Sequence, residues 1–416
     1  MDTRSSRPIV PGSTDKDLFA GVPRLSASNV DAHHETCKIC GGMSRIFDVV
    51  DFLKIVNYQN QYIGGFSGIS VYYHRCTECD FMFSNFCDTW SKEDFARYIY
   101  NDDYAKADPD YLGKRPAEYA EVMAARLKDV KWARILDYGS GLGVFAKRMQ
   151  SLGFTIESYD PFTQPDRPQG KFDIVTAFEV LEHTPDPIAA LQDVKQFMRD
   201  DSSIMATTEL QPDNIDEVRA NWPYAAPRNG HVSLFSVPAM VKLADAIGLS
   251  FHNGEGLRIF ASRRASALTD LALRIGGPPI RMIKLLAPAG DVEQTTRGTA
   301  IWHSVERSPM TNFRWTAANR IEWTVPRRDI APCRARIFIP VLIEATPGFA
   351  AGCSILLGGH SHPVRRTVAG LGAEVMLPDG WDGKLVLATP ELKSPAELGR
   401  VADHRKLGLA IPAADR

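Results

Sequence analysis

The sequence contains no run of 18 consecutive apolar residues, so a membrane-spanning helix is not expected. It also lacks a large excess of one charge: 48 Lys and Arg against 50 Asp and Glu leave a net charge of −2, which argues against a nucleic-acid partner. The first 33 residues lack the apolar segment of a signal peptide and are expected to form a disordered leader. Seven cysteines, four of them in two Cys-x-x-Cys pairs, fit a reducing cytoplasm and metal binding better than disulfides.

The pattern of the remaining chain predicts an α/β protein with additional parts on both sides of its core. Helix and strand patterns alternate over 115–264, which indicates a Rossmann-like parallel sheet covered by helices. We expect a cysteine-containing module with a connector over 34–114, a linker over 265–290 and a β-sandwich-like accessory domain over 291–416. Within the core, Ser236 followed by Pro238 predicts the start of a helix that runs to Gly248.

A glycine-rich turn in the core predicts a ligand site. A strand is expected to end at Asp137, and the turn and a helix follow at once. Glycines let the backbone turn sharply and approach a ligand, and the free N–H groups of such a turn favour a carboxylate. Asp160 closes the next strand, the position from which an acid can bind two ribose hydroxyls. The candidate ligand-binding residues are Asp137, Gly139, Ser140, Gly141, Gly143 and Asp160.

Together with the later segment FDIVTAFEVLEHTPDP, these motifs resemble the class I S-adenosylmethionine-dependent methyltransferases over about 150 of 416 residues. The resemblance implies that S-adenosyl-L-methionine is the cofactor, and that Phe178 and Glu179 line its other side. The short interval from Asp160 to Phe172 leaves little room for the family's usual third strand. Glu182-His183 resembles a family feature that mainly orders the loop, and a catalytic role is the alternative.

The two cysteine pairs predict a structural zinc site. Cys37, Cys40, Cys76 and Cys79 supply four thiolates from two knuckle-like turns, enough for a closed tetrahedral Zn²⁺. A redox role for one pair and free buried cysteines are the alternatives. Zinc pairs before such a core resemble the sugar C-methyltransferases, which nevertheless end in an α/β domain rather than a β-rich one.

The segment 229–236 is expected to face the cofactor crevice, because it follows the end of a core strand. It resembles the sugar C-methyltransferase segment in which a Glu-His pair precedes Val-Ser, and where the histidine is a proposed base. His231 is therefore the candidate general base, with a hydrogen-bonded loop histidine as the alternative. Gly230 stands in place of the glutamate, which favours O-methylation over C-methylation.

The acceptor is the least constrained part of the prediction. Tyrosines and aspartates over 98–111 suit sugar hydroxyls, and Tyr104 could cover the cofactor as a lid; a solvated linker is the alternative. The tryptophans after 300 could stack on sugar rings, although core positions are more usual. We therefore expect a cytoplasmic methyltransferase acting on a sugar nucleotide or glycan in bacterial surface polysaccharide synthesis. Small-molecule O-methylation in secondary metabolism and a non-catalytic glycan-binding or scaffold protein are the alternatives.

Overall fold

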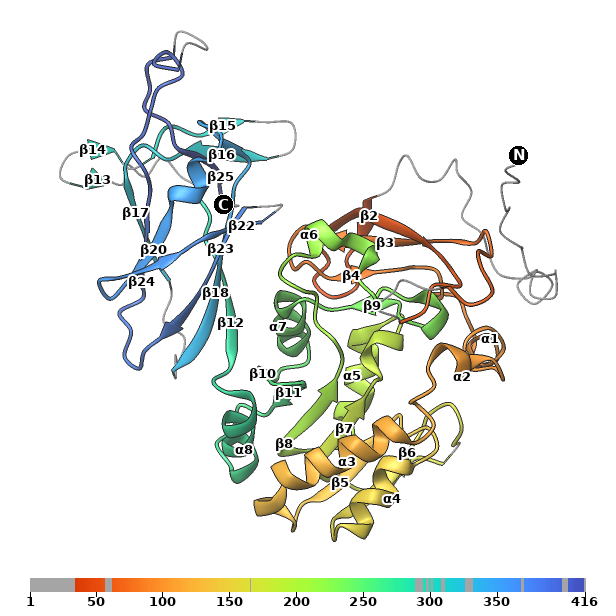
Figure 1. Cartoon of the computed structure of the whole chain (residues 1–416). Helices are drawn as coiled ribbons and strands as arrows, with labels where there is room; N and C mark the ends of the chain where they lie inside the picture. Colours follow the sequence, from red (N-terminus) through yellow and green to blue (C-terminus); the bar gives the residue numbers. More distant parts are fainter. Residues whose placement is uncertain are drawn as a thin grey trace, which may run out of the picture. The chain divides into compact units, whose positions relative to one another are not determined.

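A computed structural model of the chain describes residues 34–56, 62–164, 166–288, 295–296, 299–300, 302–307, 311–325, 332–367, 370–398 and 403–414. The chain divides into two compact units, Met1–Gly277 and Pro278–Arg416 (Figure 1). None of the described helices is long and apolar enough to cross a membrane.

The first unit contains an α/β layer whose strand order is β10-β11-β8-β7-β5-β6. The four strands β8, β7, β5 and β6 are mutually parallel, whereas β11 runs antiparallel to β8 and β10 antiparallel to β11. The strands are β5 (Arg134–Tyr138), β6 (Thr155–Tyr159), β7 (Phe172–Phe178), β8 (Met198–Thr207), β10 (Ser250–Gly254) and β11 (Leu257–Ala261). This confirms the expected parallel sheet, and within the described residues β6 lies at its edge, as the short interval after Asp160 predicts.

Helices cover this sheet on its two faces. One apolar cluster joins α3, α4 and α8 to the sheet, and α5 packs against β8 and α7. The expected start of α7 is confirmed: the Ser236 hydroxyl accepts a hydrogen bond from Ala239 N, and Pro238 stands in the first turn. The helices are α3 (Lys114–Arg126), α4 (Val144–Ser151), α5 (Pro187–Lys195), α7 (Val237–Ala246) and α8 (Ala267–Gly276).

A second sheet in the same unit is built mainly from the cysteine-containing region. Its order is β1-β2-β3-β4-β9. The last strand, β9, lies between β8 and β10 of the α/β layer in the sequence. Its strands are β1 (His34–Thr36), β2 (Met43–Asp51), β3 (Ser70–Cys76), β4 (Met82–Phe83) and β9 (Ser233–Leu234); the connector adds α1 (Lys92–Tyr98) and α2 (Tyr104–Ala107). The short helix α6 (Ile215–Val218) follows β8 in the sequence. One apolar cluster unites side chains of β2, β3, β4, β9, α1, α2 and α6, so the cysteine-containing region and the connector pack within the first unit rather than alone.

The segment 265–290, expected to be a linker, contains regular structure instead. Leu268, Leu271 and Ala272 of α8 are buried in the core of the α/β layer, which the i, i+3, i+4 spacing of these residues allows. The Gly-Gly-Pro-Pro segment at 276–279 begins with the last residue of α8 and contains the boundary between the two units. Strand β12 (Ile280–Lys284) already belongs to the second unit.

The second unit is rich in short strands, as expected. Its sheets have the orders β22-β23-β18-β12, β15-β16-β25-β19 and β17-β24-β20-β21, and β13 pairs with β14. Trp302, Trp315 and Trp381 are buried and Trp323 packs edge-on against Trp302, so the core reading of the tryptophans is confirmed. The strands are β13 (Thr295–Thr296), β14 (Thr299–Ala300), β15 (Glu306–Arg307), β16 (Asn312–Trp315), β17 (Arg320–Thr324), β18 (Cys333–Pro340), β19 (Ile343–Glu344), β20 (Ser354–Leu357), β21 (His360–Pro363), β22 (Arg365–Thr367), β23 (Gly370–Leu377), β24 (Lys384–Ala388) and β25 (Leu409–Pro412).

Candidate functional site

The glycine-rich turn between β5 and α4 has the backbone geometry that its sequence predicts. Gly139, Gly141 and Gly143 have φ values of 72°, 50° and 70°, a backbone region that residues with a Cβ rarely adopt. The N–H groups of Gly139 and Ser140 donate to the carbonyl of Tyr159, which ties the turn to the end of β6. A Cβ on Gly139 would lie 2.5 Å from Cγ2 of Val180, so the loop after β7 rests directly on this turn.

Two polar side chains at this turn have unused hydrogen-bonding capacity. Among the described residues, neither Ser140 Oγ nor Asp137 Oδ2 has a partner, and both atoms are buried. Burial is also the main reason why the pKa of Asp137 is raised to about 7, although the Thr176 hydroxyl donates to its other oxygen at 3.1 Å. Buried polar atoms without hydrogen-bond partners are uncommon, and a polar ligand lying on the turn would supply the missing partners. The turn therefore fits a cofactor that carries hydrogen-bonding groups.

Asp160 braces the same turn. Its carboxylate accepts hydrogen bonds from Gly141 N at 2.9 Å, from Phe162 N at 2.9 Å and from Thr163 N at 3.2 Å. A carboxylate has about four acceptor positions, so these bonds leave capacity for a ribose hydroxyl. The turn-cap role and the ligand-binding role are thus compatible at this residue.

Phe178 ends β7 at the carboxyl edge of the sheet, and Glu179 follows it. The Phe178 ring packs edge-on against Tyr119 of α3 and Phe145 of α4. Glu179 has a φ of 52°, which is uncommon for a residue with a side chain, and its carboxylate accepts hydrogen bonds from Thr207 Oγ1 and Tyr119 OH. Unusual backbone angles that surrounding bonds maintain occur often at binding sites, and both residues remain predicted cofactor contacts.

His231 is buried beyond the end of β8, and its orientation is fixed. Its Nδ1 lies 2.8 Å from the carbonyl oxygen of Tyr224. Because a carbonyl only accepts, Nδ1 carries the proton and Nε2 has a free lone pair. Burial, followed by the neighbouring His183, lowers the pKa of His231 well below its ordinary value, so the ring is neutral near pH 7.

The structure brings Glu182 and His183 to the same place. The rings of His183 and His231 lie 4.9 Å apart, and a nitrogen of each histidine and an oxygen of Glu182 all lie within 4.8 Å of one another. The Tyr224 hydroxyl donates to Glu182 Oε1 at 2.7 Å. A Cβ on Gly230 would lie 3.1 Å from His183 Nδ1, which explains why a glycine stands before His231. The Glu-His pair therefore lies within the candidate site.

The connector contributes a different tyrosine from the one expected. Tyr104 is 4% exposed and packs edge-on between Tyr100 and Tyr111, so it belongs to the core of the first unit. Tyr100 is 40% exposed and contacts both the ring of Phe162, beside Asp160, and the ring of His183. Tyr100 therefore spans the space between Asp160 and the histidines, where the sequence pattern pointed to Tyr104.

Residues 111–252 match a family model described as a methyltransferase domain. These residues form a methyltransferase domain. This confirms, for the core, the expected S-adenosylmethionine-dependent methyltransferase fold, and the matched range contains the glycine turn, Asp160, the Glu182-His183 pair and His231.

A ubiquinone biosynthesis O-methyltransferase of Actinobacillus pleuropneumoniae serotype 5b (strain L20) is 27% identical over 105 residues, which are 18% of this chain and 45% of that protein. The chain thus spans less than half the length of this curated relative. Among solved structures, an O-methyltransferase family protein from Burkholderia thailandensis has 13% identity and a TM-score of 0.34, over 43% of this chain and 64% of that one. The mitomycin 7-O-methyltransferase MmcR has 15% identity and a TM-score of 0.33, over 44% and 62%.

The four cysteines of the two pairs meet beside the methyltransferase domain. Cys37 Sγ lies 3.7 Å from Cys79 Sγ, and Cys40 Sγ lies 3.5 Å from Cys76 Sγ; none forms a disulfide. Four sulfurs at about 2.3 Å from a tetrahedral zinc would be roughly 3.8 Å apart, so the arrangement fits the ion. Each pair also forms the same turn, in which the N–H two residues after the first cysteine approaches that cysteine's sulfur.

Several residues that sequence patterns did not single out hold the His231 segment against the cysteine-containing region. The ammonium group of Lys54, 1% exposed, donates to the carbonyls of Ala220, Trp222 and Ala225 at 2.8–2.9 Å. Tyr73 OH donates to the carbonyl of His231 at 2.7 Å. In the sequence, only the position of Lys54 within an apolar run could have drawn attention to it. That pattern does not identify its hydrogen-bond partners, which lie more than 150 residues away.

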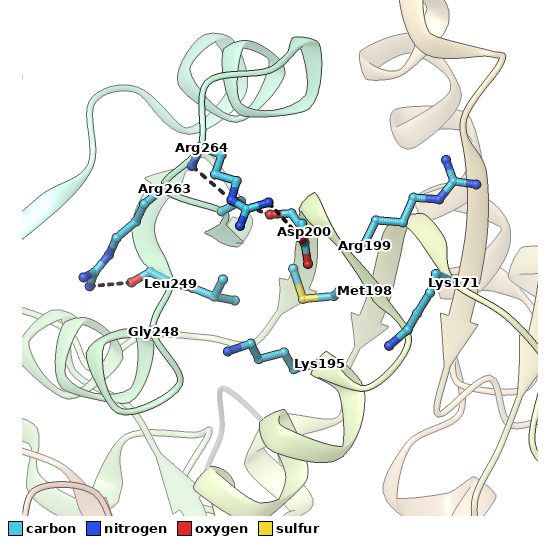
Figure 2. A pocket seen from close by; sticks show the side chains of 10 residues that line it. Lys171, Lys195, Met198, Arg199, Asp200, Gly248, Leu249, Arg263 and Arg264 are labelled. Carbon is cyan, nitrogen blue, oxygen red and sulfur yellow. Dashed lines mark hydrogen bonds and ion pairs between the residues drawn. The ribbon is translucent and has the colours of Figure 1, made fainter.

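A surface cavity of about 420 Å³ lies at the opposite, amino-terminal edge of the sheet (Figure 2). Five of its lining residues are cationic, but their charged groups are engaged in holding the fold. Lys195 Nζ donates to the carbonyl of Ile247 at the end of α7, and Lys171 Nζ to that of Gln196 after α5. In Figure 2 the side chains of Arg199 and Arg263 point away from each other, so the cations do not converge on one ligand position.

Proposed function

We propose that the chain is an S-adenosylmethionine-dependent O-methyltransferase whose acceptor is a hydroxyl of a sugar nucleotide or glycan in bacterial surface polysaccharide synthesis. The observation that carries the proposal is the neutral, oriented His231 with a free Nε2 at the carboxyl edge of the methyltransferase domain. A hydroxyl is a poor nucleophile until it loses its proton, and a positioned base contributes about 10²–10⁴-fold to such a reaction.

The bound cofactor would supply an electrophilic methyl group on a cationic sulfur. The residues of this chain would do the rest: the glycine turn with Ser140 and Asp137 would receive the methionine end, and Asp160 the ribose. Phe178 and Glu179 would line the opposite side. His231 Nε2 would take the proton of the acceptor hydroxyl as the methyl group is transferred, while the Tyr224 carbonyl keeps Nδ1 protonated.

We also propose that Cys37, Cys40, Cys76 and Cys79 form a zinc-ribbon-like module with a structural Zn²⁺, and that Pro278–Arg416 is a β-sandwich-like accessory domain. The sulfur distances of 3.5–3.7 Å support the first statement. Strand β4 follows the second cysteine pair and pairs with β9, two residues after His231. The metal would therefore stabilise the segment that carries the base, without taking part in the chemistry.

The sugar acceptor rests on the likeness of the zinc pairs and the His231 segment to sugar methyltransferases. A second acceptor class is a small phenol or similar metabolite, which the relative named for ubiquinone biosynthesis favours. The exposed rings of Tyr100 and Phe162, which contact each other at the site, suit an aromatic acceptor as well as a sugar ring.

Methyl transfer from labelled cofactor to a panel of sugar nucleotides, surface-glycan oligosaccharides and small phenols tests the proposal. We expect His231→Gln to lower kcat at least about 100-fold while cofactor affinity stays within about threefold. His252→Gln is the matched control, because His252 is also buried and its Nδ1 also contacts a backbone carbonyl, that of Gly277. Transfer to phenols alone would replace the sugar acceptor, and cofactor binding without any transfer would favour the scaffold alternative.

A further inference from the structure

Glu182 has unusual surroundings for a carboxyl group. It is 0% exposed, Tyr224 OH contacts its Oε1, and its Oε2 has no hydrogen-bond partner among the described residues. Burial is the largest influence on the pKa of Glu182, followed by the negative charge of Glu179; hydrogen bonds from its own backbone, Tyr224 and Thr208 act in the opposite direction. Together they raise this pKa to about 8, so the carboxyl is mostly protonated at neutral pH.

Glu182 also lies at the wall of the proposed cofactor crevice. The loop that carries it rests on the glycine turn through Val180, whose Cγ2 approaches Gly139. Tyr100 contacts both the ring of Phe162, beside Asp160, and the ring of His183, beside Glu182. A cation bound between the glycine turn and His231 would therefore lie near Glu182, in surroundings where charges interact strongly.

We propose that Glu182 is the final proton acceptor at this site: it is ionised while the cationic sulfonium cofactor is bound and protonated when the neutral product has formed. This inference rests on the proposed function. The acceptor O–H bond breaks and its proton goes to His231 Nε2, then to the Glu182 carboxylate, while the acceptor oxygen gains the methyl group. One cation and one anion are thus replaced by two neutral groups, so the buried crevice keeps the same net charge throughout.

The spacing of the cluster suits a proton path better than a metal. His183 Nε2 lies 4.0 Å from Glu182 Oε1, whereas nitrogen and oxygen ligands around a tetrahedral zinc would be roughly 3.4 Å apart; on the proposed path, a nitrogen of His231 lies within 4.8 Å of an oxygen of Glu182. One water molecule can relay a proton over such a gap. The titratable groups around Glu182 come from three segments: Glu179 and His183 of the loop after β7, Tyr224 and His231 after β8, and Tyr100 and Tyr104 of the connector.

Calorimetry of the full-length, zinc-loaded chain tests this charge exchange without measuring turnover. S-adenosylmethionine and S-adenosylhomocysteine share their amino and carboxylate groups, so a difference in proton release reports the sulfonium charge alone. In buffers with different ionisation enthalpies at pH 7, we expect S-adenosylmethionine to release about 0.9 proton more than the homocysteine compound, given the pKa of about 8 for Glu182. Affinity for S-adenosylmethionine should rise about fivefold from pH 7 to pH 8, and affinity for the product should stay constant.

Variants assign the released proton. Glu182→Gln should abolish the difference between the two ligands, and Glu209→Gln should retain it, because Glu209 is another partly buried acid, bonded to Trp222 Nε1. Tyr224→Phe keeps the test valid if Glu182→Gln does not fold. It removes a bond that lowers the pKa of Glu182, so the proton release should move to higher pH.

The outcomes separate this inference from the proposed function. If neither compound binds, the proposed function fails. If both bind with equal proton release, the methyltransferase proposal stands and the role of Glu182 is refuted. Release that persists in Glu182→Gln but disappears in Asp137→Asn would assign the proton to Asp137, against the inference. A second metal ion per chain in elemental analysis of the wild type, absent from Glu182→Gln, would point to a metal at Glu182, His183 and His231, and would also overturn it.

Discussion

Alanine at position 139 adds one methyl group where the structure leaves no space. The new Cβ would lie 2.5 Å from Val180 Cγ2, about 0.9 Å closer than an ordinary contact of 3.4 Å. The left-handed backbone of Gly139, with a φ of 72°, costs an alanine roughly 1–2 kcal/mol, and relieving the overlap costs about 1–3 kcal/mol more. Gly141→Ala separates these costs, because Gly141 has a φ of 50° but no atom within 4 Å of a Cβ. We expect losses of about 2–5 kcal/mol for Gly139→Ala and about 1–2 kcal/mol for Gly141→Ala.

The double variant Gly139→Ala/Val180→Ala tests the contact itself. Val180→Ala alone should cost about 1 kcal/mol, because the side chain is only partly buried, and it removes the methyl groups that the new Cβ at position 139 would meet. In urea unfolding of the full chain, the double variant should be more stable than the sum of the single losses by about 1–3 kcal/mol. In the Gly141→Ala background the same change should show no coupling. Additive losses at positions 139 and 180 would refute the packing of the Glu182 loop on the glycine turn.

Asp160→Ala should weaken S-adenosylhomocysteine binding about 30–100-fold in calorimetry, because the proposed ribose contacts and the bond to Gly141 N would be lost together; unchanged affinity would exclude the ribose role. Cys76→Ser should remove one metal ion per chain by elemental analysis and lower methyl transfer about 100-fold with cofactor affinity nearly intact, whereas Cys87→Ser, at a buried unpaired cysteine, should change neither. Burial lowers the pKa of Lys54 from 10.5 to about 8, so the unfolded chain binds more protons between these values and Lys54 adds stability as pH rises through this window. Between about pH 7.5 and 9.5, the unfolding free energy of the wild type should therefore rise by about 2 kcal/mol relative to that of Lys54→Met. The same pH dependence in both proteins would contradict the lowered pKa of Lys54.

The parts of the fold that the sequence predicts are those whose causes are local. The backbone angles of the glycine turn follow from three glycines, and the start of α7 follows from Ser236 and Pro238. The position of β6 at the edge follows from the short interval after Asp160. Each depends on residues within one turn or one connection, so spacing alone specifies it.

The parts that the sequence could not provide depend on partners distant in the chain. Lys54 bonds carbonyls 166–171 residues away, and Tyr73 bonds one 158 residues away; no local pattern encodes such contacts. The burial of Tyr104 and the exposure of Tyr100 depend in the same way on which face of the connector meets the core. Similarly, α8 occupies part of the expected linker because its apolar face packs against the α/β layer, whose strands come from earlier parts of the chain.

The pairing of β4 with β9 bears on how this chain can be divided for study. Met82 and Phe83, both fully buried, lie opposite Leu234 and Ser233, and Ser84 N donates to the carbonyl of Val232. A fragment limited to the matched range 111–252 would expose these backbone groups as an open strand edge and would leave the carbonyls that Lys54 bonds without their donor. Contacts from residues 34–110 therefore hold the segment around His231 in its folded position, and recombinant fragments should begin before Cys37.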